Sequence, residues 1–329
     1  MRERIVEMDN LRGLGILLVI LGHCVPDFPV DLRSNVLTGG LEIWIYRFHM
    51  PLFFLCSGYA FCLTTIRVQR LSFSTFINQR IKRIVIPYLV FSGISLLLRI
   101  IFSSVTRSGI NIGDAIGGIF FEGKYFWFLY TLFLISIIFK VLWDQTKNLS
   151  LMLGIAIVLY VVYAVFPIKF LCVDRIGLYS LYYVLGCYLF KYREQGNKLI
   201  QKNIFFVGSI VLYVVLNLFN LHSGSLVMES IFKVFYALIG ILLFYGISLK
   251  YKNFTFVEPF ILHFGKYSLQ YYLLHMIISL PVYYVVAKIG VSIPLISVFL
   301  NFILITLFSY IALTIAKKLP FTYVMLGIK

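Results

Sequence analysis

Long apolar stretches recur along the whole 329-residue chain, separated by short polar segments. A helix needs about 20 predominantly apolar residues to cross the ~30 Å hydrocarbon core of a bilayer. On this pattern we predict ten membrane-spanning helices, near residues 6–25, 43–65, 84–102, 125–142, 150–166, 176–191, 203–220, 230–249, 261–287 and 294–316. The expected fold is therefore all-α, a polytopic transmembrane helical bundle.

Composition narrows the class of protein further. Hydrophobic residues make up 61% of the chain and charged residues only 13%, whereas soluble globular domains have about 45–50% and about 25%. A soluble enzyme, a disordered chain and a nucleic-acid-binding protein are excluded, and membrane lipids are the expected surroundings. Because the connections are too short for a separate soluble domain, we predict a single integral membrane domain over residues 1–329.

The net charge of +16 indicates orientation in the membrane. Cytoplasmic loops of membrane proteins carry an excess of Lys and Arg. With the N-terminus inside, the inner segments hold nineteen of the 29 basic residues, the outer segments six and the spans four. This distribution favours an even number of spans with both termini in the cytoplasm. The five cysteines lack the spacing of a zinc site or a disulfide framework, so we expect them to be packing residues and predict no metal.

The first apolar stretch carries the richest set of ionisable residues. Such residues cost about 2.5–3.5 kcal/mol each at the centre of a span, which makes each one a functional hypothesis. Arg12 precedes His23 by eleven residues, about 16 Å and close to three helical turns, so both side chains lie on roughly one face. Imidazole exchanges a proton near neutral pH and suits general base catalysis. The structural alternatives are an Arg12 that snorkels or pairs with Asp9, and a His23 bonded to a neighbouring helix.

A second polar segment runs from Trp44 to Tyr59 and contains Arg47, His49 and Pro51. Proline within a span frees a backbone carbonyl, which is tolerated where neighbours or water satisfy it, so we expect a kinked helix that lines a cavity. The small pair Ser57-Gly58 lets another helix or a thin ligand approach closely. The structural alternative places Arg47 and His49 at the outer interface, paired with Glu42.

A basic inner segment contains Arg80 and Arg83, at positions i and i+3. On a helix these residues share a face, where two guanidinium forks can each bind phosphate oxygens bidentately. The phosphates of a nucleotide-containing cofactor are a suitable ligand. The alternative is a cluster of positive charge on anionic lipid headgroups.

Two further polar segments follow. Trp127 lies in the run Gly123–Tyr130, which is also typical of an outer aromatic belt. His275 lies ten residues beyond Gly265, about 15 Å along a helix, and could therefore meet His23 near the midplane. Its alternative is a structural histidine bonded to Tyr or Gln neighbours. We assign no role to His222 or His263.

Taken in order, these motifs resemble the acyltransferase-3 family of bacterial integral membrane O-acyltransferases. The motifs are Asp9–Gly13 followed by His23, Phe48–Phe54 leading to Ser57–Tyr59, Arg80-x-x-Arg83 before Pro87, Trp127–Leu129, and Tyr267 through His275. Tyr59 departs slightly from the family, in which phenylalanine is frequent there. Some members add a C-terminal esterase-like domain. We expect a stand-alone membrane domain here, so that any second transfer step needs a partner.

The resemblance implies an acetyl-CoA-dependent O-acetyltransferase in the bacterial cytoplasmic (inner) membrane. An acyl group, usually acetyl, would pass from cytoplasmic acyl-CoA to a hydroxyl of a cell-surface or lipid-linked glycan. It also implies that His23 is catalytic, that Arg12 supports the acyl donor or the histidine, and that Arg80 and Arg83 hold the CoA phosphates. Four further residues match motif positions and are expected near the substrate cavity: His49, Ser57, Trp127 and His275. Direct transfer and an acyl-histidine intermediate both remain open, and the sequence gives no oligomeric state.

The alternative class is a transporter or flippase of a lipid-linked glycan or small solute. Such a protein would use the same buried histidine and arginines as a proton or anion relay. Many secondary transporters contain internal repeats with matching broken helices. We find no such repeat in this chain, and this lowers the weight of the transporter hypothesis.

Overall fold

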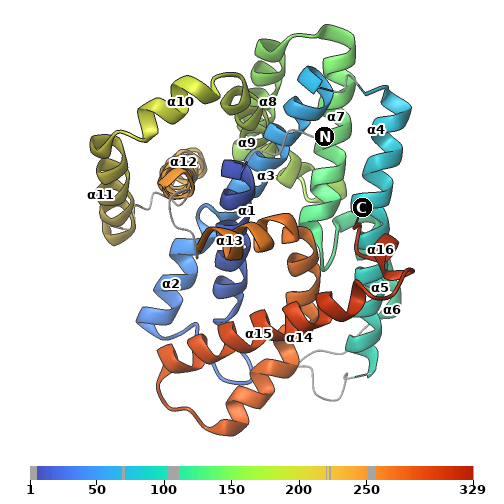
Figure 1. Ribbon diagram of the computed structural model, residues 1–329, viewed down its shortest axis with the longest axis vertical. Helices are drawn as coiled ribbons and strands as arrows, with labels where there is room; N and C mark the ends of the chain where they lie inside the picture. Colours follow the sequence, from blue (N-terminus) through green and yellow to red (C-terminus); the bar gives the residue numbers. More distant parts are fainter. Residues whose placement is uncertain are drawn as a thin grey trace. The chain divides into compact units, whose positions relative to one another are not determined.

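The computed structural model describes residues 6–68, 71–101, 111–219, 221, 224–250 and 257–328, and in these ranges it contains helices and no strand (Figure 1). The chain divides into two compact units. The first comprises Met1–Cys56 and Tyr192–Lys318, and the second comprises Ser57–Lys191 and Leu319–Lys329. The prediction of an all-α fold is confirmed.

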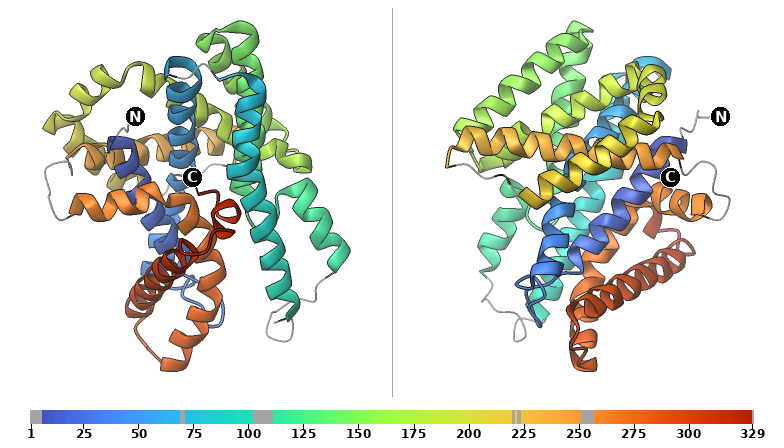
Figure 2. Two further views of the ribbon diagram at one scale, coloured as in Figure 1. Left: turned by 45° about the vertical axis from the view of Figure 1, so that its right-hand side comes forward. Right: turned by 90° about the vertical axis from the view of Figure 1, so that its left-hand side faces the viewer.

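The first unit contains the N-terminal helices and most of the C-terminal half of the chain. Its helices are α1 (Val6–His23), α2 (Val36–Tyr46), the start of α3 (His49–Phe61), α10 (Arg193–Ile200), α11 (Asn203–Phe219), α12 (Leu226–Lys250), α13 (Val257–Lys266), α14 (Ser268–Ile289) and α15 (Pro294–Ala316). Figure 2 shows α14 and α15 side by side as an antiparallel pair, which the close contact of the two helices confirms.

Two glycines bring α1 and α13 into backbone contact. A Cβ atom on Gly13 would overlap the carbonyl oxygen of Ile261, and one on Gly265 would overlap the carbonyl oxygen of Asp9. Small residues permit such close approach of helices in membranes. The glycines therefore fix the beginning of α1, the turn that carries Arg12, against α13.

The second unit holds the central part of the chain. After the end of α3 it contains the π-helix η1 (Cys62–Val68), α4 (Phe73–Arg80), the π-helix η2 (Ile81–Val85), α5 (Ile86–Ile101), α6 (Ile112–Glu122), α7 (Trp127–Thr146), α8 (Leu149–Val165), the 3-10 turn η3 (Phe170–Cys172), α9 (Val173–Lys191) and α16 (Thr322–Met325). Gly58 packs directly on the backbone carbonyl of Tyr183, and the thiol of Cys187 donates to the carbonyl of Gly58 over 3.3 Å. The close approach predicted at Gly58 is therefore the approach of helix α9.

The π-helix η2 changes the expected relation between Arg80 and Arg83. In a regular helix the N–H of residue 87 would donate to the carbonyl of Arg83, but Pro87 has no N–H. The chain widens into a π-turn instead, in which the N–H of Ile86 donates to the carbonyl of Ile81. The regular helix on which the shared face was predicted is therefore absent, because Arg80 ends α4 whereas Arg83 lies inside the π-turn. Gly327 packs against the carbonyl of Arg83.

Seven helical segments in the described part of the chain are long and apolar enough to cross a membrane. They are Val36–Thr65, Phe73–Ile101, Ile112–Thr146, Phe170–Lys191, Leu226–Lys250, Ser268–Ile289 and Pro294–Ala316. Helices α10 and α11 are bent by 76° relative to each other, and if they form one broken span the number of candidate spans rises to eight. Two of the predicted spans do not have the composition or the length of a membrane-crossing helix. Helix α1 carries three charged side chains within its 18 residues, and α8 has only 17 residues. Each of the ten predicted stretches overlaps one or more helices of the described residues, although 43–65 and 261–287 are interrupted by turns at residues 47–48 and at Tyr267. The count of ten and the cytoplasmic termini stay predictions.

Candidate active site

Three histidines and a tyrosine meet in the first unit. His23 ends α1, Tyr46 ends α2, His49 begins α3 and His275 is the eighth residue of α14. The ring centroids are 5.2 Å apart for His23 and His275, 5.7 Å for His23 and Tyr46, and 4.8 Å for Tyr46 and His49. We call these four residues the histidine cluster. The predicted meeting of His275 with His23 is confirmed.

His23 is held by two tyrosines. The hydroxyl of Tyr46 lies 3.1 Å from Nδ1 of His23, and the hydroxyl of Tyr283 donates to the backbone carbonyl of His23. Gly22 makes room for the ring of Tyr46, because a Cβ atom there would come within 2.6 Å of that ring. A neutral imidazole has one N–H donor and one acceptor nitrogen. When Nδ1–H donates to Tyr46, the lone pair of His23 is on Nε2.

Backbone carbonyls orient the other two histidines. Nδ1 of His49 donates to the carbonyl of Ile45 over 3.0 Å, and Nδ1 of His275 donates to the carbonyl of Tyr271 over 2.8 Å. A carbonyl only accepts, so in the neutral form each ring keeps its lone pair on Nε2. Nε2 of His275 is fully buried and has no hydrogen-bond partner among the described residues. A buried acceptor without a donor therefore lies beside His23.

An ion pair ties the loop after α1 to helix α2. The guanidinium of Arg33 donates to both carboxylate oxygens of Glu42 over 2.8 Å each, a bidentate geometry that is both strong and directional. Arg47, in contrast, donates to Asn217 over 2.6 Å, and its guanidinium lies 3.9 Å from the centroid of the Tyr236 ring. The structural alternative, in which Arg47 pairs with Glu42, is therefore wrong, because Arg33 holds both carboxylate oxygens of Glu42.

Arg12 adopts the pairing that was the structural alternative. Its guanidinium lies 3.6 Å from the carboxylate of Asp9 and donates to the carbonyl of Cys56 over 3.2 Å. It therefore joins α1 to α3, eleven residues before His23. Asn10 beside it is 1% exposed, and both polar atoms of its side chain lack a partner in the described ranges. In the sequence, Asn10 belongs to the motif Asp9–Gly13, and its polar neighbours give no signal of its burial.

The remaining predicted residues belong to the second unit. The guanidinium of Arg80 lies 4.8 Å from the centroid of the Phe76 ring, and Arg83 follows in the π-turn. Trp127 begins α7, stacks on Tyr179 with ring centroids 5.4 Å apart, and has the guanidinium of Arg175 at 5.1 Å from its ring. Ser57 lies half-buried in α3.

Lys140 is one of the nineteen basic residues that the sequence assigns to the inner segments, and the structure buries it. Its ammonium donates to Asp144 over 2.6 Å and lies 5.9 Å from the centroid of the Phe76 ring. Phe76 therefore has cations from both α4 and α7 near its ring. In the sequence, Lys140 stands near the end of an apolar stretch, and that position gave no signal of burial.

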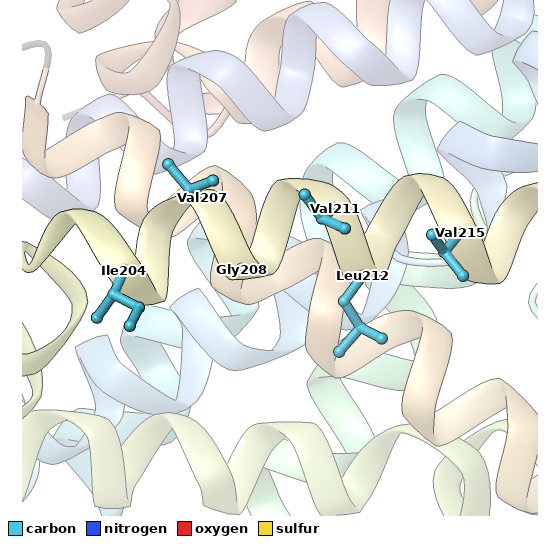
Figure 3. Close-up of a pocket in the computed structure, with 6 residues that line it drawn as sticks. All are labelled: Ile204, Val207, Gly208, Val211, Leu212 and Val215. Carbon is cyan, nitrogen blue, oxygen red and sulfur yellow. The ribbon is translucent and has the colours of Figure 1, made fainter.

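Two cavities differ sharply in chemistry. One, of about 480 Å³, runs along α11 and is lined by Ile204, Val207, Gly208, Val211, Leu212 and Val215 (Figure 3). All six lining residues are apolar or glycine on a single helix face, which suits contact with lipid chains and offers no group for catalysis. The other, of about 210 Å³, lies beside the C-terminal end of α1 and includes Tyr283 and Asn301.

Fold and site together define a multi-pass integral membrane protein with a cluster of three histidines and a tyrosine, of which His49 and His275 are buried and His23 and Tyr46 half-buried. The family model described as an acyltransferase domain matches residues 5–315. The chain belongs to this family, acyltransferase-3. The match extends over both compact units.

Two curated relatives share part of the chain. Nodulation protein NolL of Mesorhizobium japonicum is 28% identical over 151 residues, which cover 43% of this chain and 36% of the relative. Nodulation protein NolL of Sinorhizobium fredii is 28% identical over 132 residues, or 39% of this chain and 34% of the relative. The matched stretch thus spans about a third of each relative. No solved structure matches the chain.

Proposed function

We propose that the protein transfers an acyl group, acetyl in the simplest case, from cytoplasmic acyl-CoA to a hydroxyl of a cell-surface or lipid-linked glycan, in the bacterial cytoplasmic membrane. The observation that carries the proposal is the contact of 3.1 Å between Tyr46 and Nδ1 of His23, beside the unpartnered Nε2 of His275. Membership of an acyltransferase family favours this function over the transporter alternative.

His23 is the proposed general base. With its Nδ1–H donating to Tyr46, Nε2 removes the proton from the acceptor hydroxyl as that oxygen attacks the thioester carbonyl. The C–S bond then breaks, and the CoA thiolate takes the proton from the imidazolium. Tyr46 accepts the Nδ1–H bond throughout and so favours the charged ring. Attack by His23 itself, followed by transfer from an acyl-histidine, uses the same nitrogen.

Arg80 and Arg83 are the proposed holders of the CoA phosphates, with Arg12 as a further candidate for contact with the donor. Guanidinium groups bind phosphate oxygens through paired N–H donors. The aromatic ring beneath Arg80 restricts the motion of its side chain, which lowers the entropy that phosphate binding would cost. Arg12 contacts Asp9 and Cys56 in this structure, so its support for catalysis would act through the placement of α1.

The experiment uses purified full-length protein with radiolabelled acetyl-CoA, together with mass spectrometry of surface glycans from cells that have or lack the gene. We expect specific binding of acetyl-CoA, release of free CoA and an acetyl group on a glycan hydroxyl only in cells with the gene. Absence of acetyl-CoA binding, with identical glycans in both strains, would refute the proposal.

A further inference from the structure

The cavity of about 210 Å³ in the first unit is built from three elements. The loop after α1 supplies one wall, and the C-terminal end of α14 and the first turns of α15 supply the others. The lining residues include Pro26, Leu32, Tyr283, Ala287, Ser297 and Asn301. Apolar side chains make most of the wall, and the polar groups gather on α14 and α15.

Two polar side chains of this cavity hold the end of α1. Tyr283 donates its hydroxyl to the carbonyl of His23, and Nδ2 of Asn301 donates to the carbonyl of Cys24 over 3.3 Å. The cavity therefore adjoins the backbone of the proposed base and of the residue after it. A molecule bound there would lie next to the histidine cluster.

One group in the wall lacks a partner. Asn301 is 2% exposed, and its Oδ1 has no hydrogen-bond donor among the described residues. The neighbouring hydroxyl of Ser297 donates to the carbonyl of Val291 over 3.3 Å. Buried polar atoms are rarely left unpaired in proteins. A ligand hydroxyl that entered the cavity would supply the donor that Oδ1 of Asn301 lacks.

Charge and size restrict the ligand. None of the lining residues is charged, so the phosphates of CoA would lose their hydration there without compensation. The volume of 210 Å³ corresponds to about seven water molecules and is below the ~300–1,000 Å³ of pockets for drug-sized ligands. A single neutral ring with hydroxyl substituents satisfies both restrictions.

We propose that this cavity is the acceptor subsite and that it takes a neutral sugar ring. One sugar hydroxyl donates to Oδ1 of Asn301, and the C–H face of the ring lies against the apolar wall formed by Pro26 and Leu32. The assignment as an acceptor subsite rests on the proposed acyl transfer. The binding of a neutral sugar ring does not, and it can be measured without any acyl donor.

Thiol protection provides that measurement. Ala287→Cys places a thiol in the cavity wall, and Val285→Cys, at a residue that is 54% exposed on the same helix, is the matched control. The probes are the methyl glycosides of glucose, galactose, mannose and N-acetylglucosamine, with methyl glucuronide as the anionic counterpart. We expect at least one neutral glycoside to slow maleimide labelling of Ala287→Cys several-fold, with no effect of methyl glucuronide and none on Val285→Cys. Equal labelling with and without every glycoside would overturn the subsite.

Transfer kinetics test the assignment to the acceptor. Ala287→Leu narrows the cavity, Asn301→Leu removes the unpaired carbonyl, and Val285→Leu is the control. We expect both cavity variants to bind acetyl-CoA as the unmodified protein does and to transfer acetyl groups to the protecting glycoside at least tenfold more slowly. Undiminished transfer by Ala287→Leu would contradict the assignment. Failure of the unmodified protein to bind acetyl-CoA would instead refute the proposed function, while the labelling result still decides whether the cavity binds sugars.

Discussion

The hydroxyl of Tyr46 lies 3.1 Å from Nδ1 of His23 and joins the last residue of α2 to the last residue of α1. An imidazole that takes up a proton has an N–H on both nitrogens, and each then needs an acceptor. Tyr46 is the acceptor available to Nδ1. It is therefore a positioning residue for the proposed base.

Tyr46→Phe keeps the ring and removes only this hydrogen bond. General base catalysis contributes about 10²–10⁴-fold, so loss of its orienting partner is expected to lower kcat of acetyl transfer by about tenfold to a hundredfold, with the KM for acetyl-CoA unchanged. Tyr213→Phe is the control. The hydroxyl of Tyr213 donates over 2.6 Å to the carbonyl of Trp44, which lies on α2 as Tyr46 does, and this hydrogen bond does not involve His23. Equal losses in the two variants would indicate a purely structural role for Tyr46.

His23→Ala removes the proposed base itself. We expect acetyl transfer to fall by about 10²–10⁴-fold, whereas acetyl-CoA binding and elution as a folded protein in detergent stay normal. His263→Ala serves as the control, since His263 lies on α13, 3.1 Å from the hydroxyl of Tyr271, and has no proposed part in catalysis. A folded His23→Ala protein with normal transfer rates would contradict the mechanism.

Replacement of both Arg80 and Arg83 by alanine tests the donor site. A hydrogen bond to a charged group contributes about 1.5–3 kcal/mol, so loss of two guanidinium groups should raise the Kd for CoA by tenfold or more. Isothermal titration in detergent measures it, and Lys147→Ala, at an exposed side chain that pairs with Asp144, is the control. An unchanged Kd in the double variant would exclude these arginines as phosphate ligands.

The glycine contact between α1 and α13 has a measurable effect on stability. Gly265→Val would force its side chain onto the carbonyl of Asp9, and such overpacking costs about 1–3 kcal/mol. Thermal unfolding in detergent should therefore shift to lower temperature. Gly208→Val on α11 has open space around its Cβ position, and its Tm should change little. A Gly265→Val protein as stable as Gly208→Val would show that the two backbones do not meet.

His263 gives a stability change with a defined direction in pH. Burial, with Lys317 and Lys266 nearby, lowers its pKa below the ordinary value of 6.5. The unfolded chain then binds this proton more readily than the folded protein, so stability falls as the pH decreases through 6.5 and below. Thermal unfolding across this range should show the loss, and His263→Gln should reduce it. An identical pH dependence in the variant would assign the acid sensitivity to other groups.

Hydropathy predicted the helices well because the bilayer requires every span to have about 20 predominantly apolar residues. The meeting of His275 with His23 also followed from the sequence, since depth along a helix is simple arithmetic once its start is known. The count for His275 started at Gly265, whereas α14 begins at Ser268, and this difference of three residues is less than one helical turn.

Contacts between helices were harder to predict. Tyr46 is one of 23 tyrosines, and its turn toward His23 depends on the absence of a side chain at Gly22. Asn301 and Tyr283 stand in apolar stretches, and nothing in the local pattern shows that they reach the backbone at the end of α1. Such contacts are decided by the packing of separate helices, for which one sequence carries no periodic signal.

The fit of Gly327 against Arg83 has a consequence for the evolution of the chain. Pro87 removes the donor that would cover the carbonyl of Arg83, and Gly327, with a φ of 62°, occupies the space beside that carbonyl and Pro87. Residue 327 lies beyond the 5–315 region of the family match. A side chain at position 327 would also be strained by this φ, so glycine is expected there wherever proline stands at position 87, and loss of the proline alone would not free position 327 for other residues.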